Sequence, residues 1–284
     1  MNKIIECTDE YRKEFLDVLG KNKHRYEPKL VTYSTPNNKY NIDYYKWTHP
    51  YQGNWEYTEM FTNNILDYLN QTLSKNSVVL DVGAQAGILS VAFAKFAGKV
   101  ISFEPNPAAF EILNKNGEIY KNIVPYNLAC SHNDEVLEFH YSDDGLCNGG
   151  FALGCEKGVG VTGHVKPIDV YAVNLNNFLN ENHKDDISNI KLIKVDAEGH
   201  DKEIIKTIYP IINSIKPILM AELYSGSTTS EVNDLIYTIQ SINYDIYDIG
   251  RDNSGLGNPD KMKKINSIND TIIGELCNLI CLPK

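Results

Sequence analysis

Short apolar runs alternate with helical patterns through most of the chain. Residues 78–81 form a run rich in β-branched side chains after polar residues, which is typical of a buried strand. Residues 88–96 then carry the apolar positions of a buried helix, and residues 100–103 repeat the strand pattern. A strand, a glycine-containing turn, a helix and a second strand in immediate succession predict a βαβ unit and hence a parallel sheet.

The same alternation continues toward the C-terminus. Further strands are expected at residues 123–130, 136–141, 165–173, 190–195, 218–221, 244–249 and 278–282, with further helices at 108–115, 202–208 and 230–242. Strands alternating with helices predict a doubly wound α/β domain, for which we expect the bounds 76–284. The strands at 136–141 and 165–173 are expected to pair, and residues 251–264 read as an exposed loop.

The region before this domain, residues 1–75, has a different composition and is expected to form a small extension. A charged helical start is followed by residues 33–61, whose many turn formers predict an irregular segment, and residues 58–73 read as an amphipathic helix. The irregular segment carries many aromatic side chains, including Tyr44, Tyr45, Trp47, Tyr51 and Trp55. These residues could form a lid that stacks on a substrate, or they could pack in the core or at a dimer contact.

Composition narrows the function classes. A chain of 284 residues with 42% hydrophobic residues can bury a full core, and its formal charge of −10 without a basic stripe argues against a nucleic acid substrate. No run reaches the roughly 18 apolar residues of a membrane span, and the first residues lack the apolar core of a signal peptide, so we expect a cytoplasmic protein. The six cysteines show no CxxC pairing, which favours reduced thiols over zinc or disulfides.

The turn inside the βαβ unit indicates the kind of cofactor. Glu104 ends the second strand 23 residues after Asp81, near the interval of about 20 at which an acidic residue binds ribose hydroxyls in nucleotide-binding folds. The glycines, Gly83 and Gly87, depart from the G-x-G-x-x-G spacing that holds a pyrophosphate, which counts against a nicotinamide oxidoreductase. Asp81 would repel a phosphate and attract an amino group, such as that of S-adenosylmethionine.

Five motifs in order carry a family resemblance. The stretches DVGAQAG, FEPNP, NLACS, IKVDAEGHD and ILMAELY lie between about residues 77 and 224. With these motifs in register, the chain resembles the FkbM family of S-adenosylmethionine-dependent methyltransferases. It departs from the family at Gln85, where Asn is usual, and at Asp201, where Glu is usual. The resemblance implies a class I methyltransferase fold, a Rossmann-like doubly wound sheet that is mostly parallel with an antiparallel edge strand.

The resemblance also implies a cofactor site at the carboxyl ends of the strands. The expected cofactor-binding residues come from the glycine turn, the end of the second strand and the third strand, which would run beside the adenine: Asp81, Gly83, Gln85, Gly87, Glu104, Asn106, Asn127, Ala129 and Ser131. Asp81 and Gly83 would hold the amino acid end of S-adenosylmethionine, and Glu104 would hold the ribose hydroxyls.

The acidic turn after the strand at 190–195 supplies the candidate catalytic residues. An alcohol accepts a methyl group only if a base takes its proton, and His200 is the expected base, with Asp196 and Glu198 beside it. Alternatively, His200 caps the following helix and Asp196 is a structural acceptor. A metal-assisted route through Asp196 and Glu222 is a further alternative, although no metal ligand is assigned.

The predicted function is therefore O-methylation of a hydroxyl group on a sugar, glycan or related small molecule. A glycine-rich stretch at residues 142–164 could be a mobile loop on the substrate side or a long hairpin connection. A catalytically silent relative, which binds the cofactor and contacts partners through its aromatic N-terminus, is the alternative from another class. A homodimer is a further expectation. The nature of the acceptor rests on the family resemblance, because one fold hosts many substrates.

Overall fold

The computed structural model describes residues 28–46, 62–142, 165–197, 199–223, 227–250, 259–271 and 277–284, with backbone alone at residues 108, 138–142 and 165–168. The expected aromatic side chains of Trp47, Tyr51 and Trp55, the charged helical start and the stretch 143–164 lie outside these ranges.

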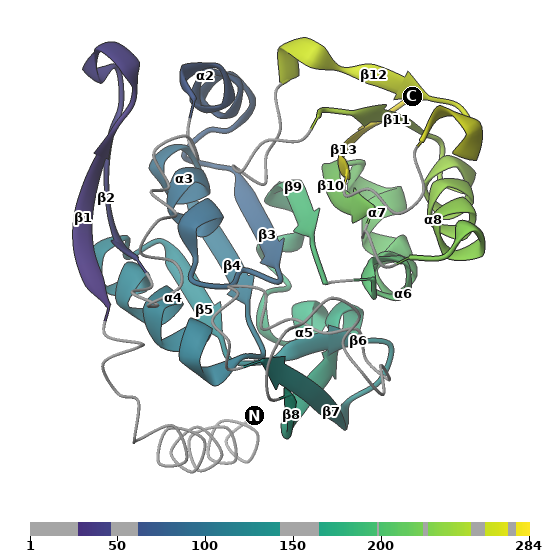
Figure 1. Ribbon diagram of the computed structural model, residues 1–284, viewed down its shortest axis with the longest axis horizontal. Coiled ribbons are helices and arrows are strands. Elements are labelled where there is room, and N and C mark those ends of the chain that lie inside the picture. The colour runs from purple at the N-terminus through teal and green to yellow at the C-terminus, as the bar shows by residue number, and fades with distance from the viewer. Residues whose placement is uncertain are drawn as a thin grey trace.

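An eight-stranded sheet forms the centre of the molecule (Figure 1). In spatial order it contains β12 (Lys263–Ile265), β11 (Tyr244–Asp248), β13 (Cys277–Pro283), β10 (Ile218–Leu223), β9 (Ile190–Val195), β3 (Val78–Val82), β4 (Lys99–Phe103) and β5 (Ile123–Tyr126). The five strands from β10 to β5 are parallel, whereas β13 runs antiparallel to β10 and β11, and β12 antiparallel to β11. The expected class I methyltransferase fold, mostly parallel with antiparallel strands toward one edge, is confirmed.

Helices cover both faces of this sheet. One face carries α2 (Asn63–Thr72), α3 (Ile88–Phe96) and α4 (Pro107–Ile119), and the other carries α5 (Leu175–Asn182), α6 (Asp201–Thr207), α7 (Tyr209–Ile215) and α8 (Thr229–Ser241). The apolar side chains of the two helix groups belong to two separate core clusters, which share the sheet between them. Parallel strands buried on both faces explain the nearly continuous apolar runs of the sequence.

A three-stranded sheet adjoins the main one. It contains β6 (Ala129–Ser131), β8 (Val165–Asn174) and β7 (Glu135–Ser142) in that order, and β7 pairs antiparallel with β8 as expected. The strand expected at residues 123–130 is wrong in its extent, because β5 ends at Tyr126 and the chain leaves the main sheet to form β6. An apolar run that passes from one sheet into another has no break in its hydrophobic pattern, so the two strands read as one.

The described part of the extension is more regular than expected. Instead of an irregular segment, β1 (Lys29–Ser34) and β2 (Asn41–Lys46) form an antiparallel hairpin around the short helix η2 (Pro36–Asn38). The turn formers concentrate in this connection, where Asn37 and Asn38 adopt positive φ values of 62° and 53°, which Asn tolerates. Ile42 and Tyr44 are buried in the same core cluster as α3, so for these positions the packing interpretation holds.

Short elements complete the C-terminal part. The 3₁₀ helices η4 (Ile187–Asn189), η5 (Pro259–Lys261) and η6 (Ile268–Asp270) lie in connections. The loop expected at residues 251–264 is partly wrong, because β12 forms within it and extends the sheet edge. The described cysteines Cys130, Cys277 and Cys281 are buried and form no disulfide bond with one another.

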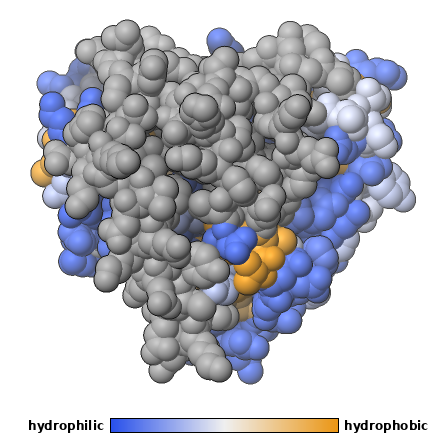
Figure 2. Space-filling model, turned by 60° about the horizontal axis from the view of Figure 1, so that its bottom comes forward, coloured by the Kyte–Doolittle hydropathy of each residue, from blue (hydrophilic) through white to orange (hydrophobic). Residues whose placement is uncertain are grey.

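Figure 2 shows one face of the molecule, on which the described residues in view are mainly hydrophilic, with small hydrophobic patches among them. The large apolar side chains that the described part exposes, Leu30, Ile119, Val136 and Tyr237, come from four different elements. None of the helices described here is both long enough and apolar enough to cross a membrane.

Candidate functional site

The turn after β3 packs directly against the end of β9. Gly83 has a positive φ of 73°, and a Cβ atom at this position would lie 1.8 Å from the carbonyl oxygen of Asp196. The Asp196 amide donates a hydrogen bond to the carbonyl of Val82 at 3.1 Å. Only glycine allows this approach, so the structure brings the expected cofactor turn and the expected catalytic turn into backbone contact.

Two further residues of the turn, Gln85 and Gly87, have left-handed backbone conformations. Gly87 has a φ of 79°, and a Cβ there would meet Leu113 Cδ1 at 2.5 Å. Gln85 has a φ of 51°, which is uncommon for a residue other than Gly or Asn. The Asn usual in the family fits this conformation better than Gln.

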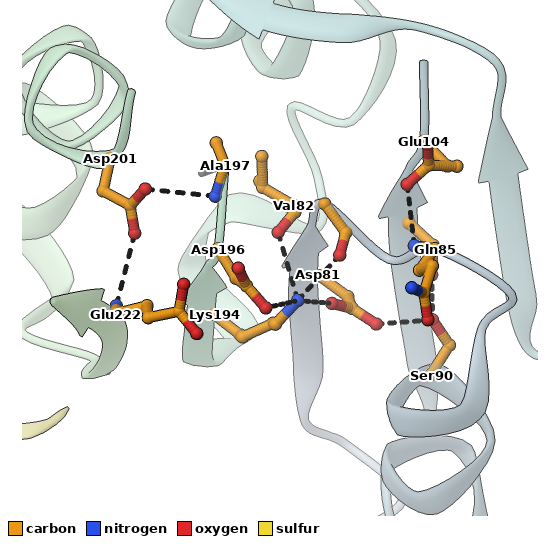
Figure 3. A network of polar contacts seen from close by, with 12 residues as sticks. Asp81, Val82, Gln85, Ser90, Glu104, Lys194, Asp196, Ala197, Asp201 and Glu222 are labelled. Carbon is orange, nitrogen blue, oxygen red and sulfur yellow. Dashed lines mark hydrogen bonds and ion pairs between the residues drawn. The ribbon is translucent and has the colours of Figure 1, made fainter. Parts of the chain in front are cut away.

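Glu104 lies at the end of β4 and faces the turn (Figure 3). Its Oε2 accepts a hydrogen bond from the Gln85 amide, and its Oε1 accepts one from the Asn106 amide, each at 2.7 Å. Burial raises the pKa of Glu104 to about 7 against the opposing effect of these two donors. A carboxylate has about four lone-pair positions, so two remain for further donors such as ribose hydroxyls.

Asp81 is bound toward the interior. Its carboxylate is fully buried, where Oδ2 accepts a hydrogen bond of 2.5 Å from Ser90 Oγ, and Oδ1 lies 3.4 Å from Lys194 Nζ. Lys194 Nζ also lies 3.3 Å from Asp196 Oδ2 and donates to the Gly83 carbonyl at 2.8 Å (Figure 3). The carboxylate with a partly exposed side chain is that of Asp196, at 34%.

Lys194 is therefore a site residue that the sequence did not indicate. Burial opposes its charge, but the carboxylates of Asp196 and Asp81 outweigh this effect and raise its pKa. A lysine in the otherwise apolar part of a buried parallel strand is unusual unless it is paired. That pattern could have pointed to Lys194, but its partners depend on strand pairing.

Asp201 stabilises the acidic turn through two hydrogen bonds with backbone amides. Its Oδ2 accepts a hydrogen bond from the Ala197 amide at 3.0 Å and its Oδ1 one from the Glu222 amide at 3.3 Å, which joins the ends of β9 and β10. Burial, with the nearby charge of Asp196, raises the pKa of Asp201 to about 7. The strands that carry Asp196 and Glu222 are neighbours, as expected. Glu198 lies outside the described residues.

His200 stands at the start of α6, where its side chain makes no capping hydrogen bond. Its Nε2 lies 3.5 Å from Ser131 Oγ, which in turn donates to Glu135 Oε1 at 3.3 Å. Burial lowers the pKa of His200 below its usual value, so the imidazole is neutral near pH 7. Because the imidazole makes no capping hydrogen bond, the alternative in which the His200 side chain caps the following helix does not hold.

The other residues expected along the cofactor are placed differently from one another. Asn127 Nδ2 donates to the carbonyls of Glu104 and Pro105 at 2.8 and 3.0 Å, so this amide stabilises the turn after β4. Asn106 is buried and its Oδ1 accepts from the Ala109 amide at 3.4 Å, at the start of α4. Ala129 and Ser131 lie on β6, and Ser131 is beside His200.

A metal site does not emerge from the described side chains. Within these ranges, no three or more His, Cys, Asp or Glu side chains are grouped so that they could hold an ion.

Comparisons with known proteins place this arrangement in context. The model of the methyltransferase FkbM domain matches residues 81–246. Among solved structures, a methyltransferase FkbM from Methylobacillus flagellatus KT is 16% identical, with a TM-score of 0.44, and the match covers 73% of this chain and 44% of that one. The chain thus spans less than half the length of that protein.

Two further solved structures are similar. A putative methyltransferase from Streptococcus mutans in complex with SAH is 13% identical, with a TM-score of 0.43 and coverage of 78% of this chain and 98% of that chain. An rRNA methylase from Streptococcus thermophilus is 12% identical, with a TM-score of 0.41 and coverage of 77% and 93%. A search of curated proteins gave no significant match.

Proposed function

The chain belongs to the FkbM family of methyltransferases, and we propose that it transfers the methyl group of S-adenosylmethionine to a hydroxyl oxygen of a sugar, glycan or related small molecule. The family assignment covers the part of the chain that holds the glycine turn, Glu104, Lys194 and the acidic turn. The observation that supports the proposal most strongly is the direct backbone contact between Gly83 and Asp196, because it joins the cofactor turn to the acidic turn.

The residues at the carboxyl ends of β3 and β4 fit this cofactor. Glu104 offers unused lone pairs to a pair of ribose hydroxyls, and the left-handed turn from Gly83 to Gly87 leaves its backbone free of Cβ atoms at both ends. Three carboxylates, those of Asp81, Glu104 and Asp196, face one lysine, Lys194. Such a site attracts the ammonium and sulfonium charges of the methyl donor and repels a pyrophosphate.

Asp196 is the carboxylate that we assign to the ligand side. Lys194 and Ser90 bind Asp81 from the interior, so Asp81 acts through Lys194 rather than by direct contact. Asp196 shares Lys194 but keeps a partly exposed side chain, which can accept from a ligand ammonium or an acceptor hydroxyl. This assignment modifies the expectation that Asp81 itself holds the amino acid end.

His200 is the proposed general base. When bound, S-adenosylmethionine supplies an electrophilic methyl group, and the acceptor oxygen has to lose a proton as it attacks. A neutral imidazole close to the acidic turn can take this proton at neutral pH. Asp196 and His200 belong to the same turn, with the imidazole beside Ser131 and the Asp196 carboxylate beside Lys194, and we assign both residues to the acceptor side.

The proposal is tested by following label from methyl-labelled S-adenosylmethionine into a panel of mono- and oligosaccharides and small alcohols. We expect the labelled product to be a methyl ether. This product resists mild base, whereas a methyl ester is cleaved by it. His200→Gln should lower kcat about 100-fold or more, as expected for loss of a general base. His183→Gln, a buried histidine bound to Tyr126 and Asp186 away from the turn, is the matched control.

Three results would contradict the proposal: label on nitrogen, label in a base-labile ester, or normal turnover by His200→Gln. A chelator arm tests the metal-assisted alternative, since only that route should lose activity when divalent ions are removed.

A further inference from the structure

The N-terminal hairpin is attached to the cofactor turn through one buried side chain, Asn116 of α4. This residue is fully buried, and its amide makes three hydrogen bonds. Oδ1 accepts from the Tyr45 amide at 2.7 Å, and Nδ2 donates to the carbonyl of Tyr45 at 3.1 Å and to that of Ala86 at 2.9 Å. Both amide protons of Asn116 are therefore used, one on the hairpin and one on the turn.

Asn116 binds the backbone at two positions, Tyr45 in the hairpin and Ala86 in the cofactor turn. Tyr45 lies on β2, opposite Leu30 of β1, and its backbone groups point to α4, so Asn116 pairs with the free edge of the hairpin as a neighbouring strand would. Ala86 lies in the turn between Gln85 and Gly87, which both have left-handed backbone conformations. Ala86 itself is 2% exposed. A buried carbonyl that loses its donor carries a penalty, so the Asn116 bond favours the conformation in which Gln85 donates to Glu104.

The hairpin depends on its contacts with the rest of the molecule, of which the Asn116 bonds are the ones that also reach the cofactor turn. A two-stranded hairpin is at best marginally stable by itself, and β1–β2 pairs with no other strand among the described residues. Figure 1 shows it standing beside α3 and α4, at the side of the molecule where β4 and β5 lie. Ile42 and Tyr44 pack into the core there, and the Lys115 ammonium lies 5.7 Å from the centre of the Tyr45 ring.

We propose that Asn116 is a positioning residue that couples docking of the N-terminal hairpin to binding of the methyl donor. Because it bonds both elements, any ligand that favours the ordered turn must also favour the docked hairpin, and this coupling is reciprocal. The inference rests on the proposed cofactor, and it makes the hairpin a functional part of the site rather than a separate appendage.

The test uses the full chain and S-adenosylhomocysteine, with two readouts. Amide hydrogen exchange should show that S-adenosylhomocysteine slows exchange in β2, although the ligand is expected at the turn. Calorimetry should show that Asn116→Ala binds the ligand about 5-fold or more weakly than the native chain, the lower end of typical coupling. In this variant the ligand should no longer protect β2.

Asn122→Ala is the matched control. The Asn122 amide also donates to two carbonyls, those of Ala94 and Ala97, at 2.8 and 3.1 Å, but these lie at the far end of α3 from the turn. This variant should bind S-adenosylhomocysteine within about twofold of the native chain, and β2 should still gain protection. Asn116→Asp, which keeps the acceptor for the Tyr45 amide and loses both donors, serves if the alanine variant does not fold.

The outcomes separate the two proposals. If the native chain binds S-adenosylhomocysteine without any change in the exchange of β2, or if both Asn116 variants bind it normally, the coupling is contradicted and the cofactor assignment stands. If the native chain does not bind the ligand at all, the cofactor assignment fails, and the coupling fails with it.

Discussion

At the scale of single residues, the site is organised around Lys194, which binds three groups at the ends of β3 and β9. It reaches the carboxylates of Asp81 and Asp196 and the carbonyl of Gly83 from one buried position. One cation between two carboxylates keeps the buried Asp81 compensated while leaving Asp196 partly exposed. This arrangement accounts for why an acidic site can persist in the interior.

Replacement of Lys194 by Met should therefore destabilise the protein strongly. The change leaves Asp81 buried without its cation, for which a loss of about 3–5 kcal/mol is typical. Urea unfolding of the native chain and of Lys194→Met measures this loss in the free energy of unfolding. The double variant Lys194→Met with Asp81→Asn removes the uncompensated charge and should recover a large part of the loss. Equal stability of the single and double variants would contradict the role assigned to the pair.

Gly83→Ala tests the contact between the two turns. A Cβ at 1.8 Å from the Asp196 carbonyl cannot be accommodated without moving the backbone, and the positive φ adds strain. We expect a loss of about tenfold or more in affinity for S-adenosylhomocysteine, measured by calorimetry, together with lower stability. Gly250 also has a positive φ, but the space around its Cβ position is open. Gly250→Ala should therefore lower the stability and leave the affinity for S-adenosylhomocysteine unchanged.

Residue types and spacing predicted part of this site. The turn at Gly83 and Gly87 and the position of Glu104 facing it could be predicted from residue types and spacing, whereas the binding of ribose by Glu104 stays a prediction. The partners of Lys194 could not be predicted, because they come together only when β3 and β9 pair. Ser131, which we expect beside the adenine, also lies 3.5 Å from His200, a contact that the sequence did not indicate because the chain leaves the main sheet after Tyr126.

At the scale of elements, the turn between β3 and α3 carries a local conflict. Gln85 holds a left-handed conformation that Asn adopts more readily, while its amide binds Glu104. Gly83 and Gly87 adopt their positive φ values without a steric penalty, so the unfavourable backbone conformation in this turn is that of Gln85.

Gln85→Asn should consequently stabilise the protein. Relief of the unfavourable conformation is expected to add about 0.5–1 kcal/mol to the free energy of unfolding, and the backbone bond to Glu104 should persist. Thermal unfolding and calorimetry with S-adenosylhomocysteine check both effects. A variant that is less stable than the native chain would show that the Gln85 side chain contributes more than its backbone conformation costs.

Most helices and parallel strands could be predicted from periodicity, whereas the hairpin and β6 could not. The tyrosines and asparagines of residues 33–46 read as irregular because β1 and β2 gain their order from packing against α3 and α4. Tertiary contacts of this kind leave little trace in a local pattern.

At the scale of the whole molecule, two buried carboxyl groups shape the response to pH. Burial raises the pKa values of Glu104 and Asp201 to about 7. Between the unfolded value of about 4 and the folded value, the native state binds more protons than the unfolded chain. The contribution of these groups to stability is therefore greatest below about pH 4, falls as the pH rises from 4 to 7, and levels off above the folded pKa.

Comparison of the native chain with Glu104→Gln isolates this effect. From pH 5 to pH 8 the free energy of unfolding of the native chain should decrease relative to the variant, by on the order of 3 kcal/mol at most. His200 has the opposite sign, because its pKa is lowered, but it is present in both proteins. Parallel stability curves for the two proteins would contradict the raised pKa of Glu104.

We assign S-adenosylmethionine to the carboxyl ends of β3 and β4, and titration calorimetry with S-adenosylhomocysteine tests this assignment most directly. We expect micromolar binding by the native chain, no binding of NAD, and a loss of affinity of about 10-fold or more in Glu104→Ala. Glu118→Ala, which removes an exposed carboxylate from α4, should bind normally. No binding of S-adenosylhomocysteine, or binding of NAD in its place, would contradict the account.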